Sequence, residues 1–271
     1  MVTKSNAELI YWAQFKNLNV KIDKKIILSN INLNIKFGEN ILLLGPNGSG
    51  KSTFLKLLNR SIYPIPADNS SFKLFDQENI NIWKLRKKIG FLFKDMEERV
   101  NKDVKLKDLI SSGFTGTFNS RYTKSLSKSN INKINSLIVE FDLMDIKNQE
   151  FCSLSDGQKR RAMLARAMVL EPKILVLDEP FCNLDLKSNF ILNKTLLNLN
   201  KKSMNIIYST HSLESILPNT NRVILIKDGK IINDGNPNKI ISSTILSDLF
   251  NISIKVIKQD NYWRSICSTT K

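Results

Sequence analysis

A glycine-rich segment that matches the phosphate-binding loop pattern G-x-x-x-x-G-K-[ST] places the strongest restriction on how this chain can fold. The segment follows an apolar run at 41–44, precedes a helical pattern at 54–58, and reads Gly45-Pro46-Asn47-Gly48-Ser49-Gly50-Lys51-Ser52-Thr53. Glycines let backbone N–H groups curl around phosphates, and the following helix points its positive end at them. We therefore expect a strand, a loop and a helix that bind a nucleotide through these loop residues. Lys51 should reach the β- and γ-phosphates, and the Ser52 hydroxyl should ligate Mg²⁺.

Hydrophobic periodicity predicts an α/β fold. Residues 14–37 alternate apolar and polar side chains, which is typical of antiparallel strands with one solvated face. Continuous apolar runs at 41–44, 174–177 and 206–208 are typical of central strands buried on both faces, and helical patterns lie between them. A further hairpin is expected on the Asp228-Gly229 turn. The prediction is a P-loop NTPase core with a mixed, largely parallel sheet and an antiparallel β subdomain.

The segment from about residue 95 to 155 is expected to be a helical insertion, because it is rich in Lys, Ser and Asn and contains no buried strand run. Ser155 and Gln158 form an S-x-x-Q capping box that opens a helix over 159–170, which Glu171-Pro172 ends. We expect one nucleotide-binding domain over 14–240, with an α-helical subdomain at about 95–170.

The remaining residues, 241–271, form a short C-terminal extension that is too small for a regulatory domain with its own core. We found no functional motif in it. Tyr262 and Trp263 are expected to be packing anchors.

Paired acids follow the apolar run at 174–177. A strand that ends there would place Asp178 beside the phosphate-binding loop, where it can hold Mg²⁺ through water. Glu179 would then lie next to the γ-phosphate and could orient and deprotonate the attacking water. An Asp-Glu pair after a strand can also be a helix N-cap, and the phosphate-binding loop in the same chain favours the catalytic interpretation.

His211 is the only histidine, and it follows the apolar run at 206–208. Ligand sites of α/β proteins form at such strand ends. An isolated histidine is more often structural, but its position one strand after the acid pair favours a contact with the γ-phosphate.

The segment Leu154-Ser155-Asp156-Gly157-Gln158 is the most discriminating motif. Taken alone it predicts a well-capped helix, whose N-terminus is also an anion site. The chain contains, in this order, the phosphate-binding loop, the LSDGQ segment, the LDEP segment and the histidine. With this set of motifs it resembles the ABC ATPase family over residues 14 to 240, and in that family the LSDGQ-type segment is called the signature. The resemblance implies an ATPase that uses ATP and Mg²⁺, with Lys51, Glu179 and His211 as catalytic residues.

The resemblance also implies a head-to-tail homodimer or pseudo-symmetric dimer. In that family the signature of one subunit closes over ATP held by the loop of the other, so Ser155, Gly157 and Gln158 are expected at nucleotide across the interface. Asn183-Leu184-Asp185 resembles the family's D-loop, which passes between the two sites.

Three departures from the family pattern concern the site. Asp156 replaces the commoner glycine, and we expect this to be tolerated because Ser155 and Gly157 remain. Ile22 occupies the position of the aromatic residue that stacks on adenine, so either adenine packing is apolar and base selectivity weak, which we expect, or another residue serves instead. Lys94 occupies the position of the Q-loop glutamine; it can contact the γ-phosphate but cannot ligate Mg²⁺, and Glu97 is a possible substitute ligand.

A narrower resemblance is to a subgroup of lone ATPases labelled molybdate-transport-type ATP-binding proteins. Residues at 98–99, 109–114, 178–185 and 261–263 carry it. The label does not establish which substrate is moved.

The expected role is the motor subunit of an ABC transporter, peripheral on the cytoplasmic face of the membrane and bound to a separate permease. No stretch approaches the roughly 18 consecutive apolar residues that a membrane helix needs, so another chain would supply the spanning segments. The alternative is an ABC ATPase outside transport, acting in cluster assembly, on nucleic acid or on ribosomes. The net charge of +16 allows a nucleic-acid partner, but the basic residues are dispersed, which disfavours one.

Overall fold

The computed structural model describes residues 11–118 and 126–268. Its centre is a six-stranded sheet in the order β5-β6-β7-β3-β8-β9. Neighbouring strands are parallel from β5 to β8, and β9 is antiparallel to β8. The strands are β5 (Ile89–Leu92), β6 (Ile174–Leu177), β7 (Asn205–Thr210), β3 (Ile41–Leu44), β8 (Arg222–Lys227) and β9 (Lys230–Gly235). The predicted α/β class and largely parallel sheet are confirmed.

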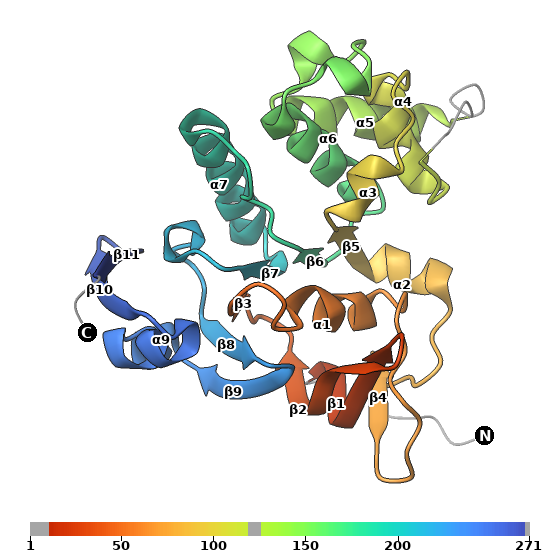
Figure 1. The fold of residues 1–271 in the computed structure, drawn as a ribbon. Coiled ribbons are helices and arrows are strands. Elements are labelled where there is room, and N and C mark those ends of the chain that lie inside the picture. The colour runs from red at the N-terminus through yellow and green to blue at the C-terminus, as the bar shows by residue number, and fades with distance from the viewer. Residues whose placement is uncertain (1–10, 119–125, 269–271) are drawn as a thin grey trace.

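A second, antiparallel sheet contains β1 (Tyr11–Ile22), β2 (Lys25–Lys36) and β4 (Ser71–Leu74) in the order β2-β1-β4. The alternation at 14–37 predicted the first two of these strands. Helix α1 (Lys51–Leu58) lies between this sheet and the central sheet, as Figure 1 shows. Its Phe54 ring lies 5.0 Å from that of Phe15 on β1. This packing fixes α1, and with it the helix end of the phosphate-binding loop, against the antiparallel sheet.

A helical region forms the upper part of the view in Figure 1. It contains α3 (Asp95–Glu98), α4 (Leu106–Ser111), α5 (Lys128–Glu140) and α6 (Asp156–Met168), while α2 (Ile82–Lys88) precedes β5. Helix α6 begins at Asp156 and not at 159, because Ser155 itself is the N-cap residue and the next residue is already helical. Residues 119–125 of this region lie outside the described part of the chain.

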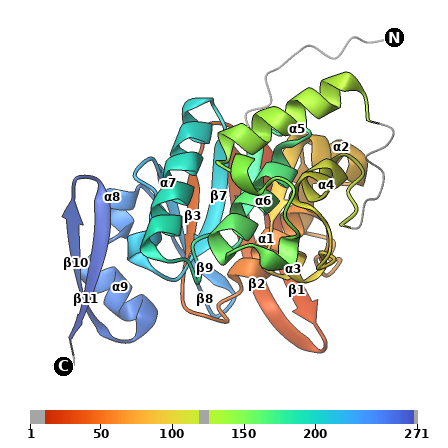
Figure 2. The same cartoon turned by 90° about the horizontal axis from the view of Figure 1, so that it is seen from above.

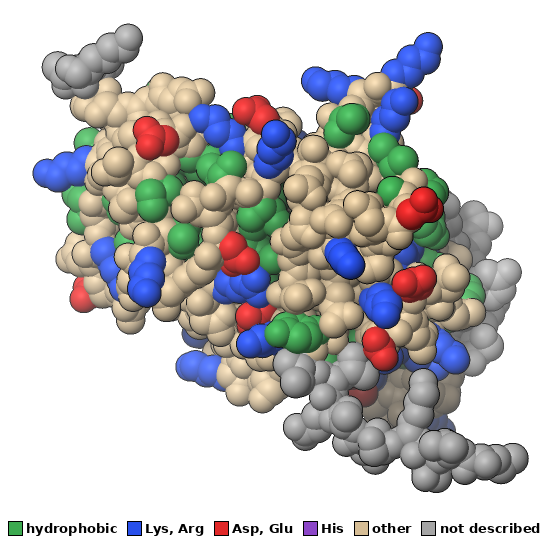
Figure 3. Space-filling model, turned by 90° about the horizontal axis from the view of Figure 1, so that it is seen from below, with side chains coloured by type: hydrophobic (Ala, Val, Ile, Leu, Met, Phe, Trp, Pro, Cys, Tyr) green, Lys and Arg blue, Asp and Glu red, His purple; other side chains and the backbone are tan. Residues whose placement is uncertain are grey.

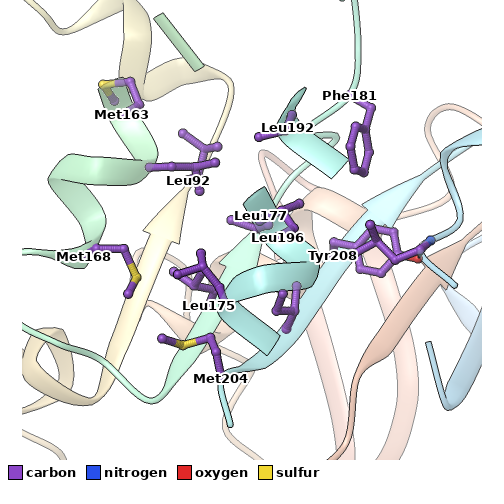
Figure 4. Packing of buried hydrophobic residues seen from close by; sticks show 14 of the residues in the cluster. Leu92, Met163, Met168, Leu175, Leu177, Phe181, Leu192, Leu196, Met204 and Tyr208 are labelled. Atoms are coloured by element: carbon purple, nitrogen blue, oxygen red, sulfur yellow. Dashed lines mark hydrogen bonds between the residues drawn. The ribbon is translucent and has the colours of Figure 1, made fainter. Parts of the chain in front are cut away.

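One face of the central sheet packs against α6 and against α7 (Leu186–Lys201). Figure 4 shows Leu92 of β5 beside Met163 of α6 and Leu175 of β6 near Met168 of α6. It also shows Leu177 of β6 beside Leu196 of α7. All of these residues belong to one buried cluster. Helix α6, the signature helix that begins within the LSDGQ segment, and strand β6, which Asp178 follows, are therefore parts of the same packed unit.

The C-terminal residues form α8 (Pro237–Ile240), α9 (Ser243–Phe250) and the antiparallel hairpin of β10 (Ser253–Gln259) and β11 (Tyr262–Ser268). Figure 2 shows the hairpin at the side of the molecule opposite α2 and α4. Trp263 is 8% exposed and joins the main buried cluster, as expected of a packing anchor. Tyr262 is 44% exposed, so its predicted packing role is wrong: adjacent residues of a strand face opposite sides.

Among the described residues, no helix is long and apolar enough to cross a membrane. On the face seen in Figure 3, Lys and Arg side chains are spread among acidic and uncharged ones. This distribution agrees with the dispersal of basic residues along the sequence.

Candidate functional site

The phosphate-binding loop runs from the end of β3 to the start of α1. Gly50 is the N-cap of α1 and has a φ of 104°, a left-handed conformation that glycine adopts without steric cost. Gly45 needs the absence of a side chain for a different reason: a Cβ there would collide with the carbonyl oxygen of Ile226 on β8. The two glycines allow the loop to turn tightly against the sheet, so that the start of α1 faces an open cavity.

Lys51 is folded back over this loop. Its Nζ donates hydrogen bonds to the carbonyl oxygens of Gly45 at 2.8 Å and Pro46 at 2.9 Å, and the residue is 5% exposed. Burial lowers the pKa of Lys51, while the nearby charges of Glu179 and Asp178 partly offset this shift. The ammonium group is thus poorly hydrated, and an incoming phosphate would compensate its charge.

Asp178 lies directly after β6 and is buried. Its Oδ1 accepts hydrogen bonds from Ser52 Oγ at 3.0 Å and from Ser209 Oγ at 2.7 Å. Ser209 Oγ in turn accepts a hydrogen bond from the backbone N–H of Glu179 at 3.0 Å. Ser209, a buried serine near the end of β7, is a residue that sequence reasoning missed. It connects both acids of the pair.

Glu179 has a φ of 46°, a left-handed conformation that costs a residue with a side chain about 1–3 kcal/mol. Its Oε1 lies 3.1 Å from Nδ1 of His211 and 3.9 Å from Nζ of Lys51. Lys51 and His211, the other two predicted catalytic residues, therefore both lie beside the Glu179 carboxylate. Glu179 remains 22% exposed and His211 43% exposed, so both face solvent where a phosphate and a water can enter.

A cavity of about 360 Å³ lies over the start of α1. Its lining residues come from the loop, the acid pair and two further positions: Asn47, Gly48, Gly50, Lys51, Ser52, Thr53, Asp178, Glu179, Lys94 and Ile27. Ile22 is not among them and is 37% exposed at the end of β1. Ile27 on β2 is the apolar residue that lines the cavity, and sequence reasoning missed it because the β1–β2 turn decides which isoleucine faces the loop.

The donor set of this cavity fits a magnesium ion. Ser52 supplies a hydroxyl and Asp178 a carboxylate, which are the hard oxygen ligands that Mg²⁺ prefers together with water and phosphate oxygens. Their oxygen atoms lie 3.0 Å apart in the hydrogen bond described above. The Ser52 hydroxyl oxygen and the Asp178 carboxylate would hold the cation between them, in place of the hydrogen bond that now joins them.

The signature segment lies elsewhere. Ser155 caps α6, with Gln158 N–H donating to Ser155 Oγ at 3.4 Å and Ser155 N–H donating to Gln158 Oε1 at 2.8 Å. Gly157 packs closely against Ser188 of α7, leaving no space for a side chain. None of Ser155, Gly157 and Gln158 lines the cavity over α1. Within one chain, the structure does not bring the signature to the phosphate-binding loop.

Lys94 and Glu97 point to different surroundings. Lys94 is exposed and lines the cavity. Glu97 is absent from the lining, and its Oε1 lies 3.2 Å from NH1 of Arg160 on α6. Burial raises the pKa of Glu97, and the charge of Arg160 acts against this shift. In this structure Glu97 connects α3 to α6, and Lys94 is the one of the two that lines the cavity over α1.

The chain resembles proteins of known family. Residues 28–182 match the family model described as ABC transporter. The chain is 31% identical to the uncharacterized ABC transporter ATP-binding protein YmeB of Lactococcus lactis over 89% of its length and 93% of the relative. It is 29% identical to the energy-coupling factor transporter ATP-binding protein EcfA of Methanocaldococcus jannaschii, covering 86% of this chain and 82% of that protein.

A similar solved structure is that of the ATP-binding cassette MJ0796, a dimer in a post-hydrolysis state bound to ADP and Pi. It aligns with a TM-score of 0.68 and 25% identity, over 83% of this chain and 98% of that one. The family match at residues 28–182 includes the phosphate-binding loop, helix α6 and the acid pair.

Proposed function

The chain belongs to the ABC transporter family, as an ATP-binding and ATP-hydrolysing motor subunit, and we propose that two copies assemble head to tail around two molecules of Mg-ATP. The observation that carries the proposal is the separation of the signature from the cavity over α1. The two separated regions each offer an anion-binding helix end, which is the start of α1 with Lys51 in one and the start of α6 with Ser155 in the other. Each region is therefore half of a nucleotide site. A second copy supplies the half that one chain lacks.

The roles of the residues follow from their chemistry. Backbone N–H groups of the loop and Lys51 hold the phosphates, and Ser52 with Asp178 would hold Mg²⁺, which supplies charge neutralisation at the phosphates. Glu179 accepts a proton from the attacking water, because its carboxylate is exposed beside Lys51. His211 contacts both Glu179 and the γ-phosphate, which keeps water, base and phosphate aligned.

Substitution of Glu179 by Gln tests this mechanism. The amide cannot accept the proton, so hydrolysis should fall by about 10²–10⁴-fold while ATP binding remains. The variant should accumulate as a dimer with ATP in size-exclusion chromatography with light scattering. Lys51→Ala in the same background is the matched control and should remain monomeric with ATP. A Glu179→Gln protein that stays monomeric at saturating ATP would contradict the composite site.

A separate membrane permease is proposed as the partner, which would place the chain at the cytoplasmic face of the membrane. A groove of 400 Å³ between α2, β5 and α6 supports an acidic docking segment, because Arg60, Arg86, Arg99 and Arg166 line it. Among the described lining residues none is acidic. Burial, and then the charge of Arg86, lower the pKa of Arg166 to about 10, and a carboxylate in the groove would relieve that repulsion.

Co-purification tests the permease. The tagged chain should retain a multi-span protein in mild detergent, and Arg86→Glu should release it without loss of basal ATP hydrolysis. Stimulation of hydrolysis by DNA or RNA, with no membrane partner retained, would contradict the transport role. The molybdate-type subgroup stays a prediction; the relative EcfA favours an energy-coupling factor type of assembly instead.

A further inference from the structure

The loop that follows His211 is bonded to the C-terminal hairpin. Glu214, in the short helical turn Leu213–Ser215, accepts two hydrogen bonds at Oε1 from Ser265 of β11: one from its backbone N–H at 2.9 Å and one from its Oγ at 3.0 Å. The other oxygen, Oε2, accepts a hydrogen bond from Ser212 Oγ at 2.7 Å. One carboxylate therefore links the residue next to His211 to a strand more than fifty positions later.

The bound form of Glu214 is the carboxylate. Burial alone would raise its pKa, but the hydrogen bonds from Ser212 and Ser265 outweigh burial and lower the pKa below its ordinary value. Hydrogen bonds to a charged acceptor are stronger than those between neutral groups. The link is thus formed fully at neutral pH.

The far end of the same loop is anchored in the core. The Tyr208 hydroxyl accepts a hydrogen bond from Leu217 N–H at 2.8 Å and is bonded to Thr220 Oγ1 at 2.8 Å. Tyr208 is fully buried. Between these ends Leu213 is also buried in the main cluster, and the side chains of Ser212 and Glu214 on either side of it are bonded to each other and, through Glu214, to the hairpin.

His211 itself has little side-chain support. Its ring is 43% exposed, and the polar contact described for it is the one to Glu179. The direction of the imidazole therefore depends on the backbone of the loop. From these contacts we propose that Glu214 and Ser265 are positioning residues: the C-terminal hairpin acts through them to hold His211 in register with Glu179. The proposal rests on the proposed role of His211 at the γ-phosphate.

The hairpin also contributes to the core, since Ile254 and Trp263 are buried in the main cluster. A purely stabilising role would explain those two residues. It would not explain why Glu214, at the surface, directs both of its oxygens into bonds that connect Ser212 with β11. The experiment must therefore separate stability from alignment.

Four variants of the full chain provide this separation. Glu214→Ala removes every bond of the link, and Ser265→Ala removes one of them. Glu214→Gln keeps an acceptor for Ser265 and a polar partner for Ser212, so it should restore the link without the charge. Ser268→Ala is the matched control, because its hydroxyl bonds only Ser253 within the same hairpin.

Steady-state hydrolysis and nucleotide affinity are measured for each. Glu214→Ala should lower kcat about tenfold, with the dissociation constant for ATP changed less than about twofold, since the cavity over α1 is intact. Ser265→Ala should lower kcat by a smaller factor, while Glu214→Gln and Ser268→Ala should be close to the parent protein. A fall in melting temperature with kcat unchanged would overturn the proposal and leave the hairpin as a stabilising element.

The single histidine gives an independent readout. Protein labelled with ¹³C-histidine should show one imidazole signal, and that signal should shift or broaden in Glu214→Ala but not in Glu214→Gln. Equal shifts in both variants would overturn a positioning role, because charge alone would then account for them.

The double variant His211→Ala/Glu214→Ala gives a kinetic test and should hydrolyse ATP no more slowly than His211→Ala. A further loss of activity in the double variant would show that Glu214 does not act through His211. If His211→Ala alone retains full activity, the proposed role of His211 fails first.

Discussion

Ser209 Oγ lies 2.7 Å from Asp178 Oδ1 and 3.0 Å from the backbone nitrogen of Glu179, so one hydroxyl on β7 fixes both acids at the end of β6. The strand register produces this arrangement: Leu177 pairs with Tyr208, which places Asp178 beside Ser209. Because Ser209 is fully buried, water cannot replace its hydroxyl there.

Substitution of Ser209 by Ala should therefore lower kcat by about tenfold. The charged acceptor loses a hydrogen bond that contributes on the order of 1.5–3 kcal/mol, and Glu179 loses its backbone restraint. A titration of hydrolysis with Mg²⁺ should also show a higher half-saturating concentration, because Asp178 is less well oriented. Ser111→Ala, which removes a buried hydroxyl that bonds only its own helix, is the control. Equal effects of the two variants on kcat would exclude a specific role of Ser209.

Much of the fold could be predicted because its signals are local. The runs at 41–44 and 174–177 are buried on both faces of the sheet, and continuous hydrophobicity records that burial. Strand β4 and the C-terminal hairpin escaped prediction because their strands are short or half exposed, and only pairing with distant segments makes them strands.

The candidate site also contains residues that could be predicted from the sequence and one that could not. Asp178 and Glu179 directly follow the buried strand β6, and Lys51 and Ser52 open the helix after the loop that follows β3, so topology brings them together. Ser209 depends on strand register, which a single sequence does not specify.

Ser155 has two separable roles, and the choice of substitution can distinguish them. Asp and Asn cap helices about as well as Ser, so Ser155→Asp and Ser155→Asn should change the free energy of unfolding by less than about 0.5 kcal/mol. Asp adds a negative charge where the partner's γ-phosphate is proposed to lie. ATP-dependent dimerisation should therefore be lost in Ser155→Asp and largely kept in Ser155→Asn, as measured by light scattering. Dimerisation of the Asp variant with ATP would mean that Ser155 does not face a phosphate.

Lys94 gives the cavity a positive charge where relatives of this kind are expected to have glutamine. Lys94→Gln should raise the KM for ATP about two- to fivefold, as expected for the loss of an exposed charge near phosphates, and should weaken the salt dependence of KM. The new amide oxygen can ligate a metal, so the Mg²⁺ concentration needed for half-maximal hydrolysis should fall. Lys147→Gln, an exposed lysine outside the cavity lining, should change neither value. An unchanged KM and salt dependence in Lys94→Gln would separate Lys94 from the nucleotide.

Base selectivity is expected to be weak, because Ile27 and not an aromatic ring is the apolar residue of the cavity lining. An apolar contact distinguishes bases poorly, so kcat/KM for GTP should be within about tenfold of that for ATP. Ile27→Tyr should lower the KM for both nucleotides, since stacking on a base contributes on the order of 1–3 kcal/mol. Ile22→Tyr is the comparison variant, because it places the same ring at the position where the family pattern has its adenine-stacking residue. Strict preference for ATP in the parent chain would contradict this interpretation.

The link between Glu214 and Ser265 also predicts a dependence of stability on pH. Hydrogen bonds from Ser212 and Ser265 outweigh burial and hold the pKa of Glu214 in the folded chain below its ordinary value of 4.5. The carboxylate therefore stabilises the fold above about pH 4.5, and this contribution is lost as the pH falls through the lower, folded value. Glu214→Gln cannot titrate, so the difference in free energy of unfolding between the parent and this variant should favour the parent more at pH 6 than at pH 4. Urea unfolding of both proteins at the two pH values measures it, and a difference that is independent of pH would mean that Glu214 is not bound as a carboxylate.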